Sequence, residues 1–172
     1  DSDVRKTARA LFGARVLVAE DNPVNVEVAR EYLQDFGCSV IVATDGREAV
    51  EAVRAGCYDL IFMDLQMPNM DGLAATGHIR AHQRAKSAWR TPIVGLTANA
   101  YAEDKARCLA AGMDDYMSKP FTESQLEAVL IRWISAKQRT SDMTVANETG
   151  RAPATAESAP AAAQASSTPA RR

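Results

Sequence analysis

The sequence of 172 residues lacks the features that mark several large classes of protein. Its three cysteines, Cys38, Cys57 and Cys108, are odd in number and widely spaced, which fits neither a disulfide framework nor a zinc site. We expect them to be small buried residues of a protein in a reducing cytoplasm. No apolar run approaches the roughly 20 residues of a membrane-spanning helix, and the first residues do not resemble a signal peptide.

The sequence also lacks a strong excess of charge of one sign, because its formal net charge is only -2. Proteins that bind a nucleic-acid backbone usually carry a basic surface, and those that lie on membranes often carry a basic amphipathic stripe. Neither feature is evident. The composition therefore argues against direct contact with nucleic acid or with a membrane.

What the sequence does contain is an apolar run, residues 60–63, that ends at Asp64 and leads into a loop containing Pro68 and Gly72. A buried parallel strand has this pattern when its carboxyl end delivers a charged side chain to a crevice. An aspartate at a strand end can also simply start a turn. This stretch alone leaves both interpretations open.

Similar apolar runs alternate with helical patterns along the chain. Because crossovers of about ten residues or more join parallel strands, five strands and five helices in alternation predict a doubly wound α/β fold with a five-stranded parallel sheet. Gly77 is expected to weaken the third helix by about 1 kcal/mol relative to Ala. We expect strands at 15–19, 38–43, 58–64, 92–96 and 115–118, helices at 23–36, 46–55, 73–81 and 102–111 and from 122 onward, and a surface connection at 83–90.

Polar residues follow four of these strands: Glu20 and Asp21, then Asp64, Thr97 and Lys119. In doubly wound folds, sites lie outside the carboxyl ends of the strands, so these side chains should meet. Three converging carboxylates repel one another and require a cation, and Mg²⁺ prefers such oxygen ligands. A metal ion, a lysine and a hydroxyl can neutralise a phosphoryl group in transfer, and a carboxylate can accept that group as an acyl phosphate. We therefore predict that Asp64 is a phosphoryl acceptor.

Four motifs lie at these strand ends, namely VAEDN (18–22), MDLQMPNMDG (63–72), LTANA (96–100) and GMDDYMSKP (112–120). Together they resemble the motifs of the receiver domain of two-component response regulators. Their sequences are most similar to the receiver modules of hybrid sensor histidine kinases, and the resemblance covers about residues 14–138. It implies a flavodoxin-like sheet with strand order 2-1-3-4-5.

The resemblance implies that Asp64 accepts a phosphoryl group from a phosphohistidine in a Mg²⁺-dependent reaction. Glu20, Asp21 and Asp64 would bind the Mg²⁺ ion together with the main-chain oxygen of Gln66. Such a module catalyses its own phosphorylation and dephosphorylation, but it is not a turnover enzyme by itself.

The resemblance also assigns a switch. Thr97 and Lys119 would contact the phosphoryl oxygens, and Tyr116 would turn inward when Thr97 moves. Plain strand packing is the alternative for Tyr116. Gln66 and Asn99 lie at positions that vary in the family and tune the lifetime of the acyl phosphate.

The implied partners are a histidine kinase and a histidine phosphotransfer domain, in cis or in trans, with the module itself a cytoplasmic monomer. The parent chain would be a hybrid sensor histidine kinase, which can be anchored in the inner membrane. We expect a lead-in or linker at residues 1–13, the receiver domain at 14–138, and a disordered tail or linker rich in Ala, Pro and Ser at 139–172.

Two other functions remain open. A Mg²⁺-dependent phosphatase can also use an aspartyl nucleophile, but such enzymes carry a second aspartate two residues later as the general acid, where this chain has Gln66. An interaction module that never carries phosphate is the other alternative, which the intact set of acceptor residues makes less attractive.

Overall fold

Five parallel strands form a single sheet in the order β2-β1-β3-β4-β5. The protein is described by a computed structural model that covers residues 11–99 and 101–134. The strand order and direction confirm the predicted flavodoxin-like, doubly wound fold. The strands are β1 (Arg15–Ala19), β2 (Ser39–Ala43), β3 (Leu60–Asp64), β4 (Ile93–Thr97) and β5 (Asp115–Ser118).

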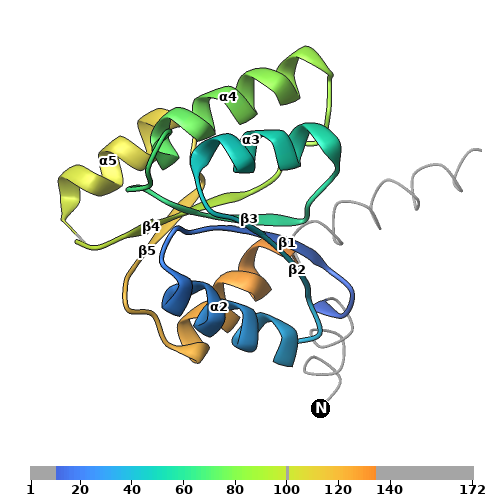
Figure 1. The fold of residues 1–172 in the computed structure, drawn as a ribbon, viewed down its shortest axis with the longest axis vertical. Helices are drawn as coiled ribbons and strands as arrows, with labels where there is room; N and C mark the ends of the chain where they lie inside the picture. The colour runs from blue at the N-terminus through green and yellow to red at the C-terminus, as the bar shows by residue number, and fades with distance from the viewer. Residues whose placement is uncertain (1–10, 100, 135–172) are drawn as a thin grey trace, which may run out of the picture.

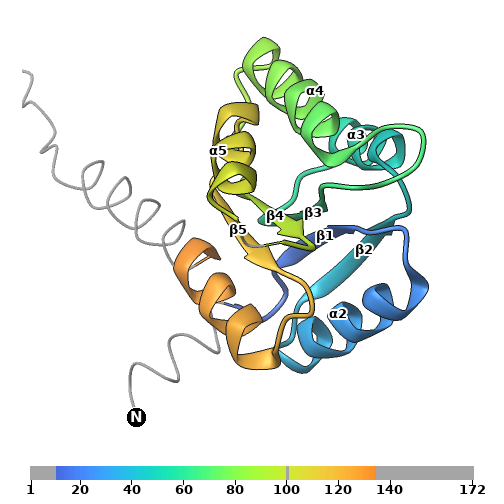
Figure 2. The same cartoon turned by 90° about the vertical axis from the view of Figure 1, so that its left-hand side faces the viewer.

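Helices cover both faces of this sheet (Figures 1 and 2). On one face lie α3 (Gly46–Ala55), α4 (Gly72–Ala85) and α5 (Ala102–Ala111). On the other lie α2 (Pro23–Asp35) and a helix that includes residues 123–134. Because every crossover passes over a face, all five strands point the same way and their carboxyl ends share one edge of the sheet.

Local signals at the helix ends explain why these segments are helical. Asn22 caps α2, since its Oδ1 accepts a hydrogen bond from the Val24 amide at 2.9 Å, and Gly37 follows the helix with a φ of +83°. A capping box begins the last helix, which the sequence places from residue 122 onward. The Thr122 amide donates to Gln125 Oε1 at 2.9 Å, and the Gln125 amide donates to Thr122 Oγ1 at 3.3 Å.

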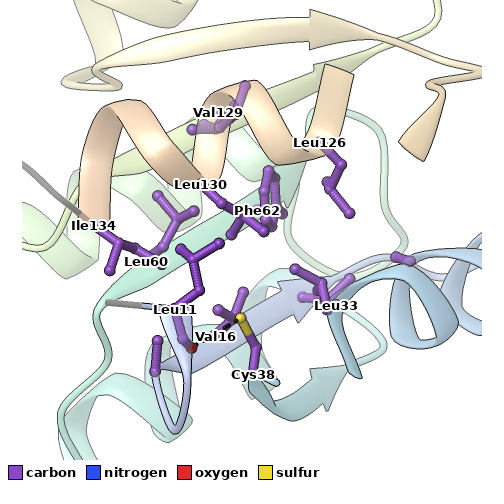
Figure 3. Close-up of a cluster of buried hydrophobic side chains, with 14 of the residues drawn as sticks. Leu11, Val16, Leu33, Cys38, Leu60, Phe62, Leu126, Val129, Leu130 and Ile134 are labelled. Carbon is purple, nitrogen blue, oxygen red and sulfur yellow. Dashed lines mark hydrogen bonds between the residues drawn. The ribbon is translucent and has the colours of Figure 1, made fainter. Parts of the chain in front are cut away.

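The core on the α2 side of the sheet extends to the first described residue. Leu11 is only 3% exposed, and Figure 3 shows it among side chains from β1, β3 and the helix over residues 123–134. Residue 11 therefore packs as part of the domain, although we placed it in the lead-in. The rest of that lead-in, residues 1–10, and the predicted tail at 139–172 lie outside the described residues.

The structure corrects the prediction for the end of the third helix. Instead of ending near residue 81 with a surface connection at 83–90, α4 continues to Ala85 and Gln83 is buried. The reason is a buried polar network. Gln83 Nε2 donates to Thr91 Oγ1 at 3.0 Å, and Gln83 Oε1 accepts from Arg80 Nη1 at 2.8 Å.

One of the three cysteines was also predicted wrongly. All three are free thiols, and Cys38 and Cys108 are buried as expected, but Cys57 is exposed. It lies in the loop after Gly56 has ended α3, where the neighbouring Tyr58 takes the buried position. Burial raises the pKa of the Cys38 thiol to about 11, which keeps that thiol protonated at neutral pH.

Gly77 lies in the middle of α4, is exposed, and has no atom within 4 Å of the position where a Cβ would stand. We expect Gly77→Ala to raise the free energy of unfolding by about 1 kcal/mol, because alanine gives up less backbone entropy in a helix and meets no clash here. Urea denaturation of both proteins measures the difference. An unchanged midpoint and slope would contradict the expectation.

Among residues 11–99 and 101–134, no helix has the length and apolar character needed to cross a bilayer.

Candidate functional site

The three carboxylates that the sequence places after two strands meet in the structure. Glu20 and Asp21 follow β1, and Asp64 ends β3, the neighbouring strand in the sheet. One oxygen from each of the three lies within 4.8 Å of the others. The parallel register, which pairs Ala19 with Met63, brings these side chains to the same edge.

Two of these carboxylates are almost fully buried. Glu20 is 1% exposed and Asp64 is 3% exposed, whereas Asp21 is exposed to solvent. Burial raises the pKa of Glu20, and the negative charge of Asp64 raises it further. The cluster therefore holds its negative charge at a cost, which a bound cation would relieve.

Lys119 supplies a fixed positive charge to the cluster. Its Nζ donates to Asp64 Oδ2 at 2.7 Å and to Glu20 Oε2 at 3.1 Å. Burial alone would lower the pKa of Lys119, but the hydrogen bonds and charges of Asp64 and Glu20 outweigh this and raise it. Lys119 follows β5 and is joined to Pro120 by a cis peptide bond. Because its pKa is raised, the Lys119 amine is protonated at neutral pH.

The backbone around Asp64 is held by a close approach between β3 and α4. The Gln66 amide donates to Asp64 Oδ1 at 3.1 Å, and the Gly72 amide donates to the Leu65 carbonyl at 3.1 Å. A Cβ on Gly72 would lie 2.0 Å from the Asp64 carbonyl oxygen, so only glycine fits there. The loop between these elements therefore returns tightly onto the carboxyl end of β3.

Thr97 ends β4 and is 3% exposed. Its Oγ1 accepts from the Asn99 amide at 3.1 Å and lies 2.7 Å from the Asn99 carbonyl oxygen and 3.3 Å from Asp104 Oδ2. The sequence predictions included Thr97 and Asn99 but missed Asp104. The available signal was weak, namely an acid in the first turn of the helix that follows Thr97.

These residues surround a cleft of about 800 Å³ at the carboxyl edge of the sheet. All of its candidate metal ligands are oxygens, which fits a hard cation such as Mg²⁺ better than a metal that prefers nitrogen or sulfur. The cleft has room for an ion and a phosphoryl group. Its polar lining includes Glu20, Asp21, Asp64, Gln66, Thr97, Asn99 and Lys119, all predicted as site residues from the sequence, with Asp104 and Arg107 beside them.

Tyr116 lies apart from this cleft. It is half-buried on β5 and packs against the core on the α3, α4 and α5 side of the sheet. The Lys105 ammonium stands 5.6 Å from the centre of its ring, a cation–π contact between α5 and β5. In this conformation the aromatic ring therefore faces α5.

Comparison with known proteins gives one consistent family. The family model of the response regulator receiver domain matches residues 16–131. The sensor protein GacS of Pseudomonas syringae pv. syringae is 44% identical over 119 residues, which cover 69% of this chain and 13% of that protein. This chain therefore spans only a small part of that relative.

Solved structures point to the same family. The receiver domain of a sensor histidine kinase from Pseudomonas aeruginosa PAO1, with a magnesium ion coordinated in its active-site cleft, is 43% identical with a TM-score of 0.65, covering 72% of this chain and 98% of that one. A second similar structure is the receiver domain of Ssk1 from Saccharomyces cerevisiae, which was crystallised with the histidine phosphotransfer protein Ypd1. It is 31% identical with a TM-score of 0.71, and the similarity covers 73% of this chain and 92% of that one.

Proposed function

Because the chain belongs to the family of response regulator receiver domains, we propose that it is the phosphoacceptor of a two-component phosphorelay and that Asp64 carries the phosphoryl group. The observation that carries this proposal is the position of Asp64. Its buried carboxylate lies beside two other acids and 2.7 Å from the ammonium of Lys119. The side chain is thus placed where both a cation and an anion can be held.

In the proposed reaction an oxygen of the Asp64 carboxylate attacks the phosphorus atom of a phosphohistidine. The new oxygen–phosphorus bond forms as the phosphorus–nitrogen bond breaks, and the imidazole leaves with the electron pair of that bond. Lys119, which already donates to Asp64, is placed to donate to the phosphoryl oxygens as charge gathers there. Neutralisation of charge and positioning are the main contributions that such a transfer needs.

Glu20, Asp21 and Asp64 would hold a Mg²⁺ ion, together with the main-chain oxygen of Gln66. When bound, the ion neutralises negative charge on the phosphoryl oxygens. The side chains favour this role because they offer oxygen ligands only. In addition, Glu20 and Asp64 are both buried and share a single ammonium, that of Lys119, within the part of the chain that the structure describes.

The rest of the proposed machinery concerns the response to phosphate. The Thr97 hydroxyl would donate a hydrogen bond to a phosphoryl oxygen. Tyr116 would then turn inward from its place beside Lys105. Gln66 and Asn99, both in the lining of the cleft, would tune how long the acyl phosphate lasts.

The proposed partners are a histidine kinase that donates the group and a histidine phosphotransfer domain that receives it. Support comes from the similarity to GacS and to a receiver domain crystallised with the phosphotransfer protein Ypd1. We further propose a cytoplasmic, monomeric module that works within a hybrid sensor histidine kinase.

A phosphatase that turns over external esters is the weaker candidate. Such an enzyme needs a general acid two residues after its nucleophile, and the carboxamide of Gln66 is too weak an acid to protonate a leaving group from that position. Steady hydrolysis of p-nitrophenyl phosphate by the chain would favour this alternative over the acceptor function.

Incubation of the chain with acetyl phosphate and Mg²⁺ tests the proposal directly. We expect the mass of the protein to rise by one phosphoryl group, and we expect hydroxylamine to remove that group because it is an acyl phosphate. A matched sample with EDTA in excess should remain unlabelled. Labelling that survives hydroxylamine, or that proceeds equally in EDTA, would contradict the proposal.

A further inference from the structure

The proton of the Thr97 hydroxyl is engaged in this structure. A hydroxyl has a single proton to donate and two lone pairs to accept with. The Asn99 amide uses one lone pair, and the proton faces two acceptors, the Asn99 carbonyl at 2.7 Å and Asp104 Oδ2 at 3.3 Å. Because Thr97 is 3% exposed, water has little access to compete for these positions.

Asp104 is an anionic acceptor in the first turn of α5. Among the described residues, the cationic side chain that pairs with it is Arg107, whose Nη1 lies 3.7 Å from Oδ1, beyond hydrogen-bond distance. The Asp104 side chain is 22% exposed and lines the same cleft as Asp64. A carboxylate thus lies beside the hydroxyl that the phosphoryl group would need.

We propose that Asp104 is a positioning residue that holds the Thr97 hydroxyl in the unphosphorylated chain and competes with the phosphoryl group for its proton. This rests on the proposed function, since it concerns the same site. A phosphoryl group on Asp64 brings about two negative charges and strong acceptor oxygens into the cleft. Two anions then compete for one hydroxyl proton. Asp104 therefore disfavours the phosphorylated state of Asp64 and favours the unphosphorylated one.

The substitution Asp104→Asn separates this role from general packing, because asparagine has nearly the same shape. The amide Nδ2 can donate to Thr97 Oγ1 instead of accepting from it, so a phosphoryl oxygen then competes for the hydroxyl proton with the neutral Asn99 carbonyl and no longer with a carboxylate. We expect the Kd for beryllofluoride with Mg²⁺, a mimic of the acyl phosphate, to tighten about five- to tenfold. The acyl phosphate formed from acetyl phosphate should last longer by a similar factor.

Glu103→Gln is the matched control, because Glu103 is an exposed acid in the same helical turn. It removes the same charge, yet it should change the Kd by less than about twofold, since exposed charges near a site are screened. A gain equal to that of Asp104→Asn would show a general charge effect and overturn the proposal.

The Thr97→Val background completes a double-mutant cycle, because valine removes the hydroxyl. There Asp104→Asn should change the Kd for beryllofluoride by less than about twofold. An undiminished effect in that background would mean that Asp104 acts without Thr97, which contradicts the proposal.

The amide chemical shift of Asn99 gives a readout in the free protein. That amide donates to Thr97 Oγ1 at 3.1 Å, so Asp104→Asn should move its signal while Glu103→Gln leaves it in place. If Asp104→Asn leaves this signal unchanged, the contact between Asp104 and Thr97 is contradicted. This readout does not depend on whether the site binds phosphate. Failure of the wild type to bind beryllofluoride or to be labelled would instead count against the proposed function.

Discussion

Substitution of Asp64 by asparagine is expected to lower labelling by acetyl phosphate at least about 100-fold, because an amide oxygen is a poor nucleophile. The change keeps the shape of the side chain but removes the negative charge that lies 2.7 Å from Lys119 Nζ. The oxygen that would form the acyl phosphate is then lost as a nucleophile. Intact-protein mass spectrometry before and after hydroxylamine measures the label.

Asp71→Asn is the matched control for this substitution. Asp71 is an acid in the lining of the same cleft and caps α4, with Oδ1 accepting from the Ala74 amide at 2.7 Å. Asparagine is also a good N-cap, so α4 should be retained. We expect labelling close to that of the wild type. Equal labelling of Asp64→Asn and wild type would show that another residue is the acceptor.

Substitution of Arg80 by methionine is expected to lower the free energy of unfolding by about 3 kcal/mol, because it leaves buried partners without their charge and hydrogen bonds. Arg80 is 5% exposed, and its Nη2 donates to Asp114 Oδ2 at 2.8 Å. It also donates to the carbonyls of Gly112 at 2.9 Å and Thr91 at 2.7 Å. Burial lowers the pKa of the guanidinium to about 10, against the opposing effect of Asp114, so the group stays charged at neutral pH.

Urea denaturation of Arg80→Met and of a surface control measures this difference. Arg30→Met is a suitable control, because Arg30 pairs with Glu27 on the exposed face of α2 at 2.9 Å, with 39% and 69% of the two side chains exposed. Exposed pairs of this kind contribute about 0.5 kcal/mol or less. If both variants lose the same small amount, the network around Arg80 contributes little to stability.

Arg80 also illustrates what the sequence could not indicate. Its neighbourhood in the chain is polar and basic, which favours a solvated surface. The burial of Arg80 and Gln83 depends on Asp114, 34 residues from Arg80, and on Thr91, which lies eight residues from Gln83 but beyond the turn that follows α4. Local periodicity carries no information about such partners, so the helix was predicted to end too early.

Asp104 was missed for a related reason. An acid in the first turn of a helix is common, because it interacts favourably with the amino-terminal end of the helix dipole. The distance of 3.3 Å to Thr97 Oγ1 and a place in the lining of the cleft distinguish it from its exposed neighbour Glu103. That distance depends on how the loop after β4 folds back, which no pattern of residue types specifies.

The sequence by itself determined the fold and which polar residues meet at one edge of the sheet. Alternating strands and helices with long crossovers permit a parallel sheet, and parallel strands deliver the residues at their carboxyl ends to one edge. The sequence therefore predicts that five side chains meet, and the structure places all five around one cleft. They are Glu20, Asp21, Asp64, Thr97 and Lys119. Their roles in phosphate transfer remain predictions.

Only the tertiary structure decided which polar side chains are buried and which contacts cross between elements. It placed Leu11 in the core, exposed Cys57, and left Gly72 without room for a Cβ beside Asp64. The physical reason is that strand and helix patterns report local backbone preference and average burial. Contacts between side chains depend on the distances set when distant segments pack together.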